Sequence, residues 1–401
     1  MRSTSRCVGV LLILFLLALE AVAQESPVSR PLGFVKGISW GWVGSRGEYA
    51  SPEAAESMRK LAETGAEWVC IAFAANLNTP HDTDFTWGDE NSWMVTDDEL
   101  REAIDLAREN GLKVMLKPVV NCTDGTWRAW IRFYRPVTDE ERAAGTTGEF
   151  DPWGDEPHMR EGEVTDLEAW AKWWDNYSAF LVHYAKIAQE KDVELFCLGC
   201  EMNSTEQFVD RWRELIAQVR DAYDGQLTYD INHGREAELP WWDAVDVISV
   251  SAYYEVPPPE GSTVEEAIEA TTAQEEIEAR LVGVKEQLAE VSRKWNKPIL
   301  FIETGVTNVR GCARYPWSHP NANPDSPLDE AEQANYYRAF YDVFWDEPWF
   351  MGFAWWDWPA RLYDRDAAAE NRGFCIYGKQ AEDVVREWYA KPAPNSQAAS
   401  P

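Results

Sequence analysis

Two glutamates that directly follow short apolar runs are the residues of this sequence best suited to chemistry. Glu201 follows the run Leu195–Cys200, and Glu303 follows Pro298–Ile302. Apolar runs of this length are typical of strands that are buried on both faces. An ion pair would explain one such strand-end glutamate equally well, but two of them indicate catalysis.

A pair of carboxyl groups suits the hydrolysis of a glycosidic bond. One carboxyl gives a proton to the leaving oxygen while the other attacks the sugar carbon, and a separation of about 5–5.5 Å gives the retaining outcome. The proton donor has to be protonated and the nucleophile ionised, so their surroundings have to set the two pKa values apart. We therefore expect Glu201 and Glu303 to meet at one site.

The elements that would position these side chains alternate along the chain. Apolar runs are separated by stretches of helical periodicity, which predicts parallel strands joined by crossover helices. No glycine-rich phosphate loop follows the first run, which disfavours an open dinucleotide-binding sheet. Eight repeated units predict an α/β fold, a closed (β/α)8 TIM barrel that forms one catalytic domain over residues 32–391. The runs are Gly33–Trp40, Ala66–Phe73, Leu112–Val120, Val193–Cys200, Gln226–Asn232, Val245–Tyr253, Pro298–Ile302 and Phe350–Trp356.

In this barrel Glu201 ends the fourth strand and Glu303 ends the seventh. Barrel enzymes build their active sites at these C-terminal strand ends. Because side chains alternate along a strand, we expect Glu201 on the face of Cys197 and Glu303 on the face of Phe301. Both glutamates are then expected to point over the barrel axis.

Tryptophan is abundant after the predicted strands. The chain has 22 tryptophans, and its two long connections, residues 121–164 and 304–328, also follow strands. Sugar rings have apolar C–H faces that pack on indole, whereas each tryptophan taken alone is more often a core residue. Taken together, the loop set predicts sugar binding; its members are Trp40, Trp42, Trp87, Trp93, Trp127, Trp130, Trp153, Trp317 and Trp358.

Five motifs at the predicted strand ends are specific enough to compare with a known family. They are Lys117-Pro118, Phe196 to Glu201, Ala252-Tyr253-Tyr254, Lys297 to Gly305 and Gly352 to Trp358. Together they resemble glycoside hydrolase family 113, which belongs to the retaining clan A of barrel glycosidases. Known members of that family are mainly endo-β-1,4-mannanases. The likeness covers nearly the whole chain after its N-terminal segment and is most specific at the two glutamates.

The resemblance implies a role for each matching residue. Glu201 would be the acid/base and Glu303 the nucleophile, with Tyr253 donating a hydrogen bond that keeps Glu303 ionised. Trp356 would form the floor beneath the sugar at the cleavage point. Asn232, Lys117 and Asn121 are expected to bind sugar hydroxyls, and Trp40 and Trp127 to bind sugar as members of the loop set.

Two residues depart from the pattern. Cys200 stands where many clan A members have asparagine, and Val119 stands where the family more often has histidine. The leading hypothesis is a retaining endo-β-1,4-mannanase that acts on mannan or glucomannan by double displacement. Because Val119 bears on substrate contacts, another clan A β-glycanase or a β-mannosidase is the alternative. A barrel that binds sugar without cutting it is the third hypothesis.

Composition limits the partners of the protein. The formal net charge is −32, from 69 acidic and 37 basic residues. Such a field repels nucleic acid and anionic membrane surfaces, whereas a neutral carbohydrate is indifferent to it. We expect a β-linked polysaccharide or oligosaccharide as the partner and a monomeric protein.

The N-terminal residues are typical of an export signal. Two arginines precede the apolar run Val8–Leu19, and a small-x-small pattern ends at Ala23. We expect a signal peptide over residues 1–23, a linker over 24–31 and a flexible tail over 392–401. The mature protein is then secreted or periplasmic, without membrane association.

Neither a metal nor another cofactor is expected. The five histidines are scattered and form no zinc-binding pattern. Cys197 and Cys200 form a C-x-x-C, but they lie in an apolar strand with no second such pair. The acidic loop Asp82–Glu90 lacks the glycine spacing of an EF-hand and is expected to be a solvated loop. Six cysteines remain after the signal, and disulfides are permitted but not required.

Overall fold

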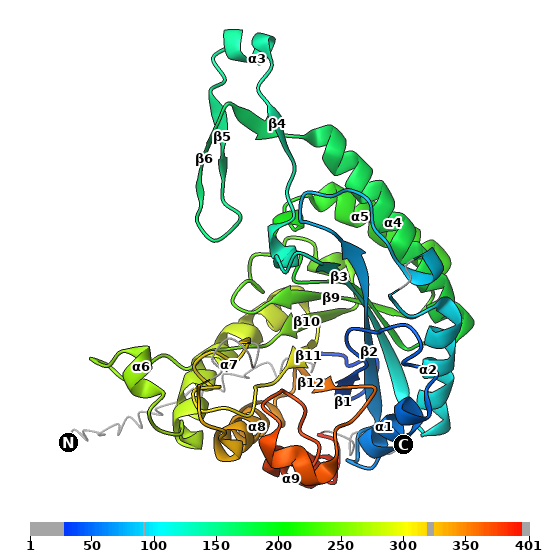
Figure 1. Ribbon diagram of the computed structural model, residues 1–401, viewed down its shortest axis with the longest axis vertical. Helices are drawn as coiled ribbons and strands as arrows, with labels where there is room; N and C mark the ends of the chain where they lie inside the picture. Colours follow the sequence, from blue (N-terminus) through cyan, green and yellow to red (C-terminus); the bar gives the residue numbers. More distant parts are fainter. Residues whose placement is uncertain (1–27, 91–92, 319–324, 395–401) are drawn as a thin grey trace, which may run out of the picture.

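Eight parallel strands form a closed barrel in the computed structural model, which describes residues 28–90, 93–318 and 325–394 (Figure 1). Neighbours around the barrel follow the order β1, β2, β3, β8, β9, β10, β11 and β12. Every predicted run supplies one strand, so the predicted (β/α)8 barrel is confirmed. The strands are β1 Val35–Trp40, β2 Trp68–Leu77, β3 Lys113–Cys122, β8 Leu195–Cys200, β9 Gln226–Asn232, β10 Val247–Ser251, β11 Ile299–Thr304 and β12 Phe350–Trp358.

The barrel interior is filled by side chains. One buried cluster on the inner faces combines residues of seven strands, namely Val35, Trp68, Cys70, Met115, Leu195, Cys197, Val247, Leu300, Ile302, Met351 and Ala354. The outer faces pack against the surrounding helices in a second and larger cluster. Because each strand is buried on both sides, its sequence is a nearly continuous apolar run, which is why the strands could be predicted.

Helices surround the barrel, and the first two begin where their capping residues predict. Ser51 accepts a hydrogen bond from the backbone of Ala54, and Thr96 and Glu99 form a capping box. The helices are α1 Pro52–Ala62, α2 Asp97–Glu109, α3 Asp139–Ala143, α4 Leu167–Glu190, α5 Val209–Ala222, α6 Val264–Ala267, α7 Gln274–Trp295, α8 Glu330–Phe344 and α9 Gln380–Tyr389. Short 3₁₀ turns are η1 Gly88–Glu90, η2 Arg128–Trp130, η3 Asn203–Thr205, η4 Trp242–Ala244 and η6 Arg365–Glu370.

The connection between β3 and α4 forms an arm that projects from the barrel (Figure 1). Its antiparallel pairs are β4 Tyr134–Pro136 with β7 Glu163–Thr165, and β5 Gly148–Asp151 with β6 His158–Glu161. The buried carboxylate of Asp151 holds the arm together, because Arg132 and Arg160 both pair with it. Sequence analysis identified this segment only as a long loop, since these strands are short and polar.

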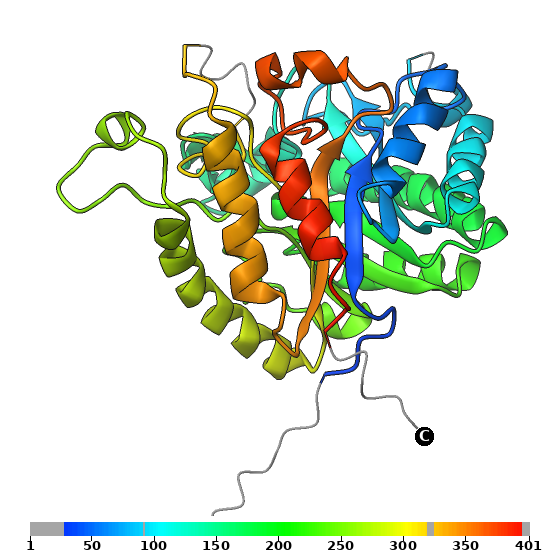
Figure 2. The ribbon, with the colours of Figure 1, turned by 90° about the horizontal axis from the view of Figure 1, so that it is seen from below.

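The described chain begins and ends at the end of the barrel where the strands start (Figure 2). Lys36 in β1 donates hydrogen bonds from Nζ to the backbone oxygens of Tyr389 and Lys391, which anchors α9 there. The predicted signal peptide lies outside the described residues, as does most of the predicted tail. Within the described ranges, no helix has the length and apolar composition required to cross a bilayer.

Candidate active site

A cavity of about 560 Å³ opens at the C-terminal ends of the barrel strands. Glu201 and Glu303 both line it, although they are 102 positions apart in the sequence. The complete lining is Trp42, Val119, Trp127, Arg128, Cys200, Glu201, Asn232, His233, Tyr253, Glu303, Trp317, Trp356 and Phe374. Six of these thirteen side chains are tryptophan, tyrosine or phenylalanine, and polar groups lie among them, as in a site for an amphipathic ligand.

An irregularity at the end of β8 turns Glu201 toward the cavity. The pairing of β8 with β9 shifts in register between Cys197 and Cys200, so strict alternation is interrupted there and Cys200 also lines the cavity. Glu201 adopts the left-handed region at φ 53°, and its backbone amide donates to Asp230 at 2.8 Å. A left-handed non-glycine residue is uncommon and concentrates at functional sites.

A similar irregularity at the end of β11 positions Glu303. Leu300 and Ile302 face the barrel interior, whereas Phe301 packs outward against Phe344 at 4.9 Å. The expectation that Glu303 shares a face with Phe301 is therefore wrong. The register of β11 shifts against both of its neighbours near this point, and the shift brings Glu303 to the inner side. Sequence periodicity alone does not reveal such a bulge.

Glu303 accepts hydrogen bonds on both of its oxygens. The Tyr253 hydroxyl donates to Oε1 at 2.8 Å, which confirms the predicted contact, and Lys117 Nζ donates to Oε2. Burial alone raises the pKa of Glu303, but the Lys117 ammonium, the nearby Arg128 guanidinium and the Tyr253 hydroxyl outweigh it. The pKa of Glu303 therefore lies below its ordinary value, and the carboxylate is ionised.

Lys117 does not bind sugar hydroxyls as expected. Its side chain is inaccessible to solvent and lies beneath the cavity, where Nζ pairs with Asp230 at 2.5 Å and also with Glu303. Sequence reasoning missed Asp230, whose pKa rises to about 6 because of burial, despite the lysine. An acidic residue inside an apolar strand was the signal that could have identified it.

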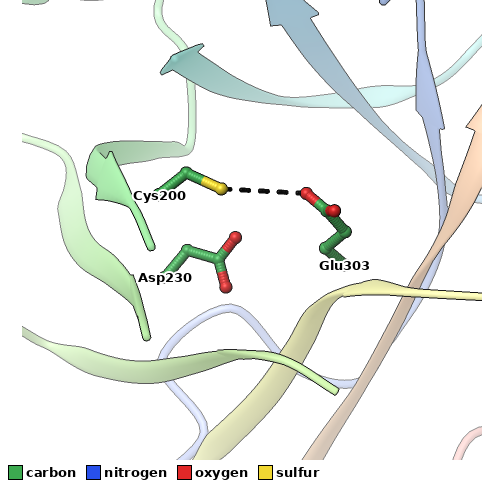
Figure 3. Close-up of side chains that lie close together, drawn as sticks. All are labelled: Cys200, Asp230 and Glu303. Carbon is green, nitrogen blue, oxygen red and sulfur yellow. Dashed lines mark hydrogen bonds between the residues drawn. The ribbon is translucent and has the colours of Figure 1, made fainter. Parts of the chain in front are cut away.

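Cys200, Asp230 and Glu303 place one sulfur and two carboxylate oxygens within 4.8 Å of one another (Figure 3). Such a set of donors could hold a divalent ion in other surroundings. Here Lys117 Nζ contacts both carboxylates, so a protein ammonium supplies the positive charge between them. Burial raises the pKa of the Cys200 thiol well above its ordinary value, which disfavours the thiolate that a metal would need.

Glu201 receives two donors on one oxygen. Trp127 Nε1 donates to Oε2 at 2.9 Å, and Arg128 Nη1 donates to the same atom at 3.1 Å. Burial and the negative charge of Glu303 nevertheless raise the pKa of Glu201 above its ordinary value. The two glutamates thus have pKa values displaced in opposite directions, as an acid and a nucleophile require.

The remaining expected site residues divide into two groups. Asn232, Trp127 and Trp356 line the cavity with the glutamates. Trp40 is a fully buried core residue whose Nε1 donates to Ser57, so its assignment to sugar binding is wrong. Asn121 is half-buried in β3 and is not part of the cavity lining, so its expected contact with substrate stays a prediction.

Sequence reasoning also missed Arg128, His233 and Phe374 as lining residues. Arg128 follows the predicted Trp127 directly in the connection after β3, and His233 follows the predicted Asn232 at the end of β9. Phe374 comes from the connection between β12 and α9, where no pattern indicated a site. Trp42 and Trp317, named only among the loop tryptophans, do reach the cavity.

Comparison with known proteins agrees with the geometry of the cavity. The model of Glycoside Hydrolase Family 113 matches residues 38–379. The GH113 β-mannanase AaManA from Alicyclobacillus acidocaldarius, solved in complex with ManMIm, is 38% identical, with 90% of this chain and 98% of that chain covered at a TM-score of 0.71. A GH113 β-1,4-mannanase solved as a complex is 33% identical, with 90% and 100% covered at a TM-score of 0.73.

More distant structures share only the fold. A β-glucuronidase from Faecalibacterium prausnitzii is 14% identical, with 90% of this chain and 50% of that chain covered at a TM-score of 0.53. A sequence comparison with curated proteins finds no match. The family model spans most of the chain, and the glutamates meet in one cavity of a barrel that matches the family's solved structures. The protein is therefore a glycoside hydrolase, and the chain belongs to glycoside hydrolase family 113.

Proposed function

We propose that the protein is a retaining endo-β-1,4-mannanase in which Glu303 is the nucleophile and Glu201 the acid/base. One observation carries these roles: two buried carboxyls share a cavity, and their surroundings lower the pKa of Glu303 and raise that of Glu201. Double displacement needs this pair of ionisation states before the substrate reacts.

The contacts support a sequence of proton and bond changes. Glu303 attacks the anomeric carbon while Glu201 gives its proton to the leaving oxygen, which produces a glycosyl-enzyme and a free chain end. Glu201, now ionised, takes a proton from water, and that water releases the sugar from Glu303. Trp127 and Arg128 keep the Glu201 carboxyl oriented through both steps. Lys117 and Tyr253 stabilise the carboxylate of Glu303 before attack and after release.

The assignment of mannan as the substrate is supported by the solved relatives. Three chains described as GH113 β-mannanases or β-1,4-mannanases are 33–38% identical over 90% of this chain. The cavity lining adds the aromatic faces of Trp42 and Trp356, whose ring centroids are 5.7 Å apart. These faces suit the C–H surface of a pyranose ring.

The test is a reducing-end assay on mannan, glucomannan, xylan and mixed-linkage β-glucan, with chromatography of the products. We expect oligosaccharides from mannan and glucomannan, and loss of turnover in Glu303→Gln. Glu194→Gln is the matched control, because Glu194 precedes the same strand as the acid/base but pairs with Arg108 away from the cavity. Preferred cleavage of xylan or β-glucan would overturn the substrate, and release of monosaccharide alone would overturn endo action.

We further propose that the protein is exported, with cleavage after Ala23, and that it acts as a monomer. The export proposal is supported by the charged, apolar and small-residue order of residues 1–23. Intact mass of the exported protein is expected to correspond to a chain that begins at Gln24, and a mass that retains residues 1–23 would contradict this. Light scattering of the same sample measures its molar mass and so tests whether the protein is a monomer.

A further inference from the structure

The connection from β12 to α9 brings Phe374 to the cavity from a turn at residues 371–374. Figure 2 shows this connection, in orange and red, over the end of the barrel opposite the ends of the described chain. Phe374 lines the cavity, and its ring lies edge-on to the ring of Tyr253, with 6.5 Å between the centroids. Because the Tyr253 hydroxyl donates to Glu303, Phe374 supports the residue that orients the proposed nucleophile. The placement of this turn therefore bears on the geometry of the site.

Lys379 holds the turn from the residue before α9. Its Nζ donates to the side-chain oxygen of Asn371 at 3.0 Å and to the backbone oxygen of Gly373 at 3.1 Å. The same Asn371 oxygen accepts from the backbone amide of Gly373 at 3.0 Å, so the turn closes on itself next to the ammonium. Both of these acceptors belong to the turn that presents Phe374.

The position of Lys379 is unfavourable for stability. Lys379 is 2% exposed, and burial lowers the pKa of its ammonium to about 8, despite the nearby charges of Glu330 and Asp357. The two oxygens that accept from Nζ are uncharged, so they only partly offset the cost of removing the ammonium from water. Lys379 also stands at the N-terminus of α9, where the helix dipole disfavours a cation. Proteins break such rules mainly where a functional site needs the residue.

Contacts from two other elements fix the same turn. The backbone amide of Asn308, which follows β11, donates to the backbone oxygen of Arg372 at 3.0 Å. In α8, Gln333 Nε2 donates to the backbone oxygen of Phe374 at 3.3 Å. The turn is therefore held to three elements of the fold, and Lys379 supplies the contact from the start of α9.

We propose that Lys379 is a positioning residue, which holds Phe374 against Tyr253 and so keeps the Tyr253 hydroxyl on the nucleophile. This inference rests on the proposed function, in which Glu303 is that nucleophile. Without Lys379 the turn relaxes and Phe374 withdraws, so the hydrogen bond from Tyr253 weakens. Because this bond lowers the pKa of Glu303, loss of Lys379 is expected to raise that pKa.

The experiment measures the pH profile of kcat/KM in a double-mutant cycle between Lys379 and Phe374. In Lys379→Met, kcat/KM at the pH optimum is expected to fall about tenfold, and the acidic limb to move up by about one pH unit. Lys379→Arg keeps a cationic donor and is expected to restore part of both. In the Phe374→Ala background, Lys379→Met is expected to have little further effect. Lys36→Met is the matched control, because Lys36 is also buried and donates to two backbone oxygens, but at the opposite end of the barrel.

Lys36→Met is expected to leave the acidic limb in place. An equal shift in the Phe374→Ala background would mean that the charge of Lys379 acts directly, and an unmoved limb in folded Lys379→Met would mean that the lysine only stabilises the fold. Either result would overturn the proposal. If Lys379→Met does not fold, Asn371→Ala removes one acceptor of the lysine and is expected to move the limb in the same direction. An unmoved limb in that variant would also overturn the positioning role.

The proposed function can fail separately from this inference. The pH profile can be measured on any glycan that the protein cuts, so a preference for xylan contradicts the proposed substrate alone. If no glycan is cut, carbon-13 NMR titration of the Glu303 carboxyl replaces the kinetic measurement, with its resonance assigned from Glu303→Gln. A raised pKa of Glu303 in Lys379→Met supports the positioning role, and an unchanged pKa refutes it.

Discussion

Lys117 and Asp230 form an ion pair inside the barrel, with 2.5 Å between Nζ and Oδ2 and no solvent exposure of either side chain. The same ammonium contacts Glu303, so the proposed nucleophile belongs to a buried cluster of two acids and one cation. Removing one partner from a buried pair leaves an uncompensated charge and costs about 3–5 kcal/mol. Folding stability and the ionisation of Glu303 are therefore linked through Lys117.

Replacement of this lysine is predicted to move the acidic limb of the pH profile. In Lys117→Met the carboxylate of Glu303 keeps its burial but loses its main cation, so its pKa rises. Activity needs ionised Glu303, so the acidic limb of kcat/KM is expected to move up by about one to three pH units. Lys113→Met, in the same strand but exposed, is expected to leave the limb unchanged.

If Lys117→Met does not fold, Lys117→Met/Asp230→Asn removes both charges of the pair and keeps the side-chain shapes. The double variant is expected to fold and to show a smaller shift in the same direction, because it also lacks the Asp230 charge that opposes ionisation of Glu303. An unchanged acidic limb in a folded variant would contradict the role of Lys117.

The hydroxyl of Tyr253 is predicted to contribute to turnover. Tyr253→Phe removes the hydrogen bond to Glu303 Oε1 and leaves the ring in place. Hydrogen bonds to charged groups are worth about 1.5–3 kcal/mol, which corresponds to about a 10- to 160-fold fall in kcat/KM. Tyr254→Phe is the matched control, because the Tyr254 hydroxyl bonds to Glu236 instead. Similar losses in both variants would show that the effect is structural.

The hydrogen bond from Trp127 is predicted to shift the alkaline limb of the pH profile of kcat/KM. Its indole N–H donates to Glu201 and lowers the pKa of that carboxyl, against the larger effect of burial. Trp127→Phe removes the donor, so the pKa of Glu201 rises further and the protonated acid persists to higher pH. The alkaline limb of kcat/KM is expected to move upward, whereas Trp130→Phe leaves it in place. A downward movement would mean that Glu201 is not the proton donor.

Asp357 is predicted to destabilise the fold at neutral pH. Burial, together with the charge of Glu303, raises its pKa to about 6. Below about pH 4 the side chain is protonated in both the folded and the unfolded protein, so its raised pKa does not change the free energy of unfolding. Above pH 6 the side chain is ionised in both states, and its burial then lowers the free energy of unfolding by the full amount. Asp357→Asn is therefore expected to raise the free energy of unfolding at pH 8 by at most about 3 kcal/mol, with no gain at pH 4. Urea titrations at both pH values, with exposed Asp366→Asn as control, test this.

Much of the fold could be predicted because buried strands leave a direct pattern in the sequence. The run that ends at Cys200 is apolar since both of its faces are covered, and the capping box at Thr96 marks the start of a helix. The arm between β3 and α4 gave no such pattern. Its strands are short, and its buried centre is the charged residue Asp151 rather than an apolar run.

The two carboxylates of the site could be predicted from the sequence, but the buried pair of Lys117 and Asp230 beside them could not. Glu201 and Glu303 stand out because an ionisable residue ends an apolar run. The register shifts that aim them inward depend on pairing with neighbouring strands, which periodicity within one strand does not record. The same limit explains Lys117, which pairs with Asp230 inside the barrel, and Trp40, which packs outward with its Nε1 donating to Ser57 of α1.

The most direct test of the proposed mechanism is to trap the glycosyl-enzyme. A 2-deoxy-2-fluoro-β-mannosyl fluoride slows both steps, and peptide mass spectrometry locates the sugar that stays attached. Double displacement on this site predicts one label, an ester on the side chain of Glu303, and no label in Glu303→Gln. A label on another residue, or mannan products released with inverted anomeric configuration, would contradict the assignment of Glu303 as the nucleophile.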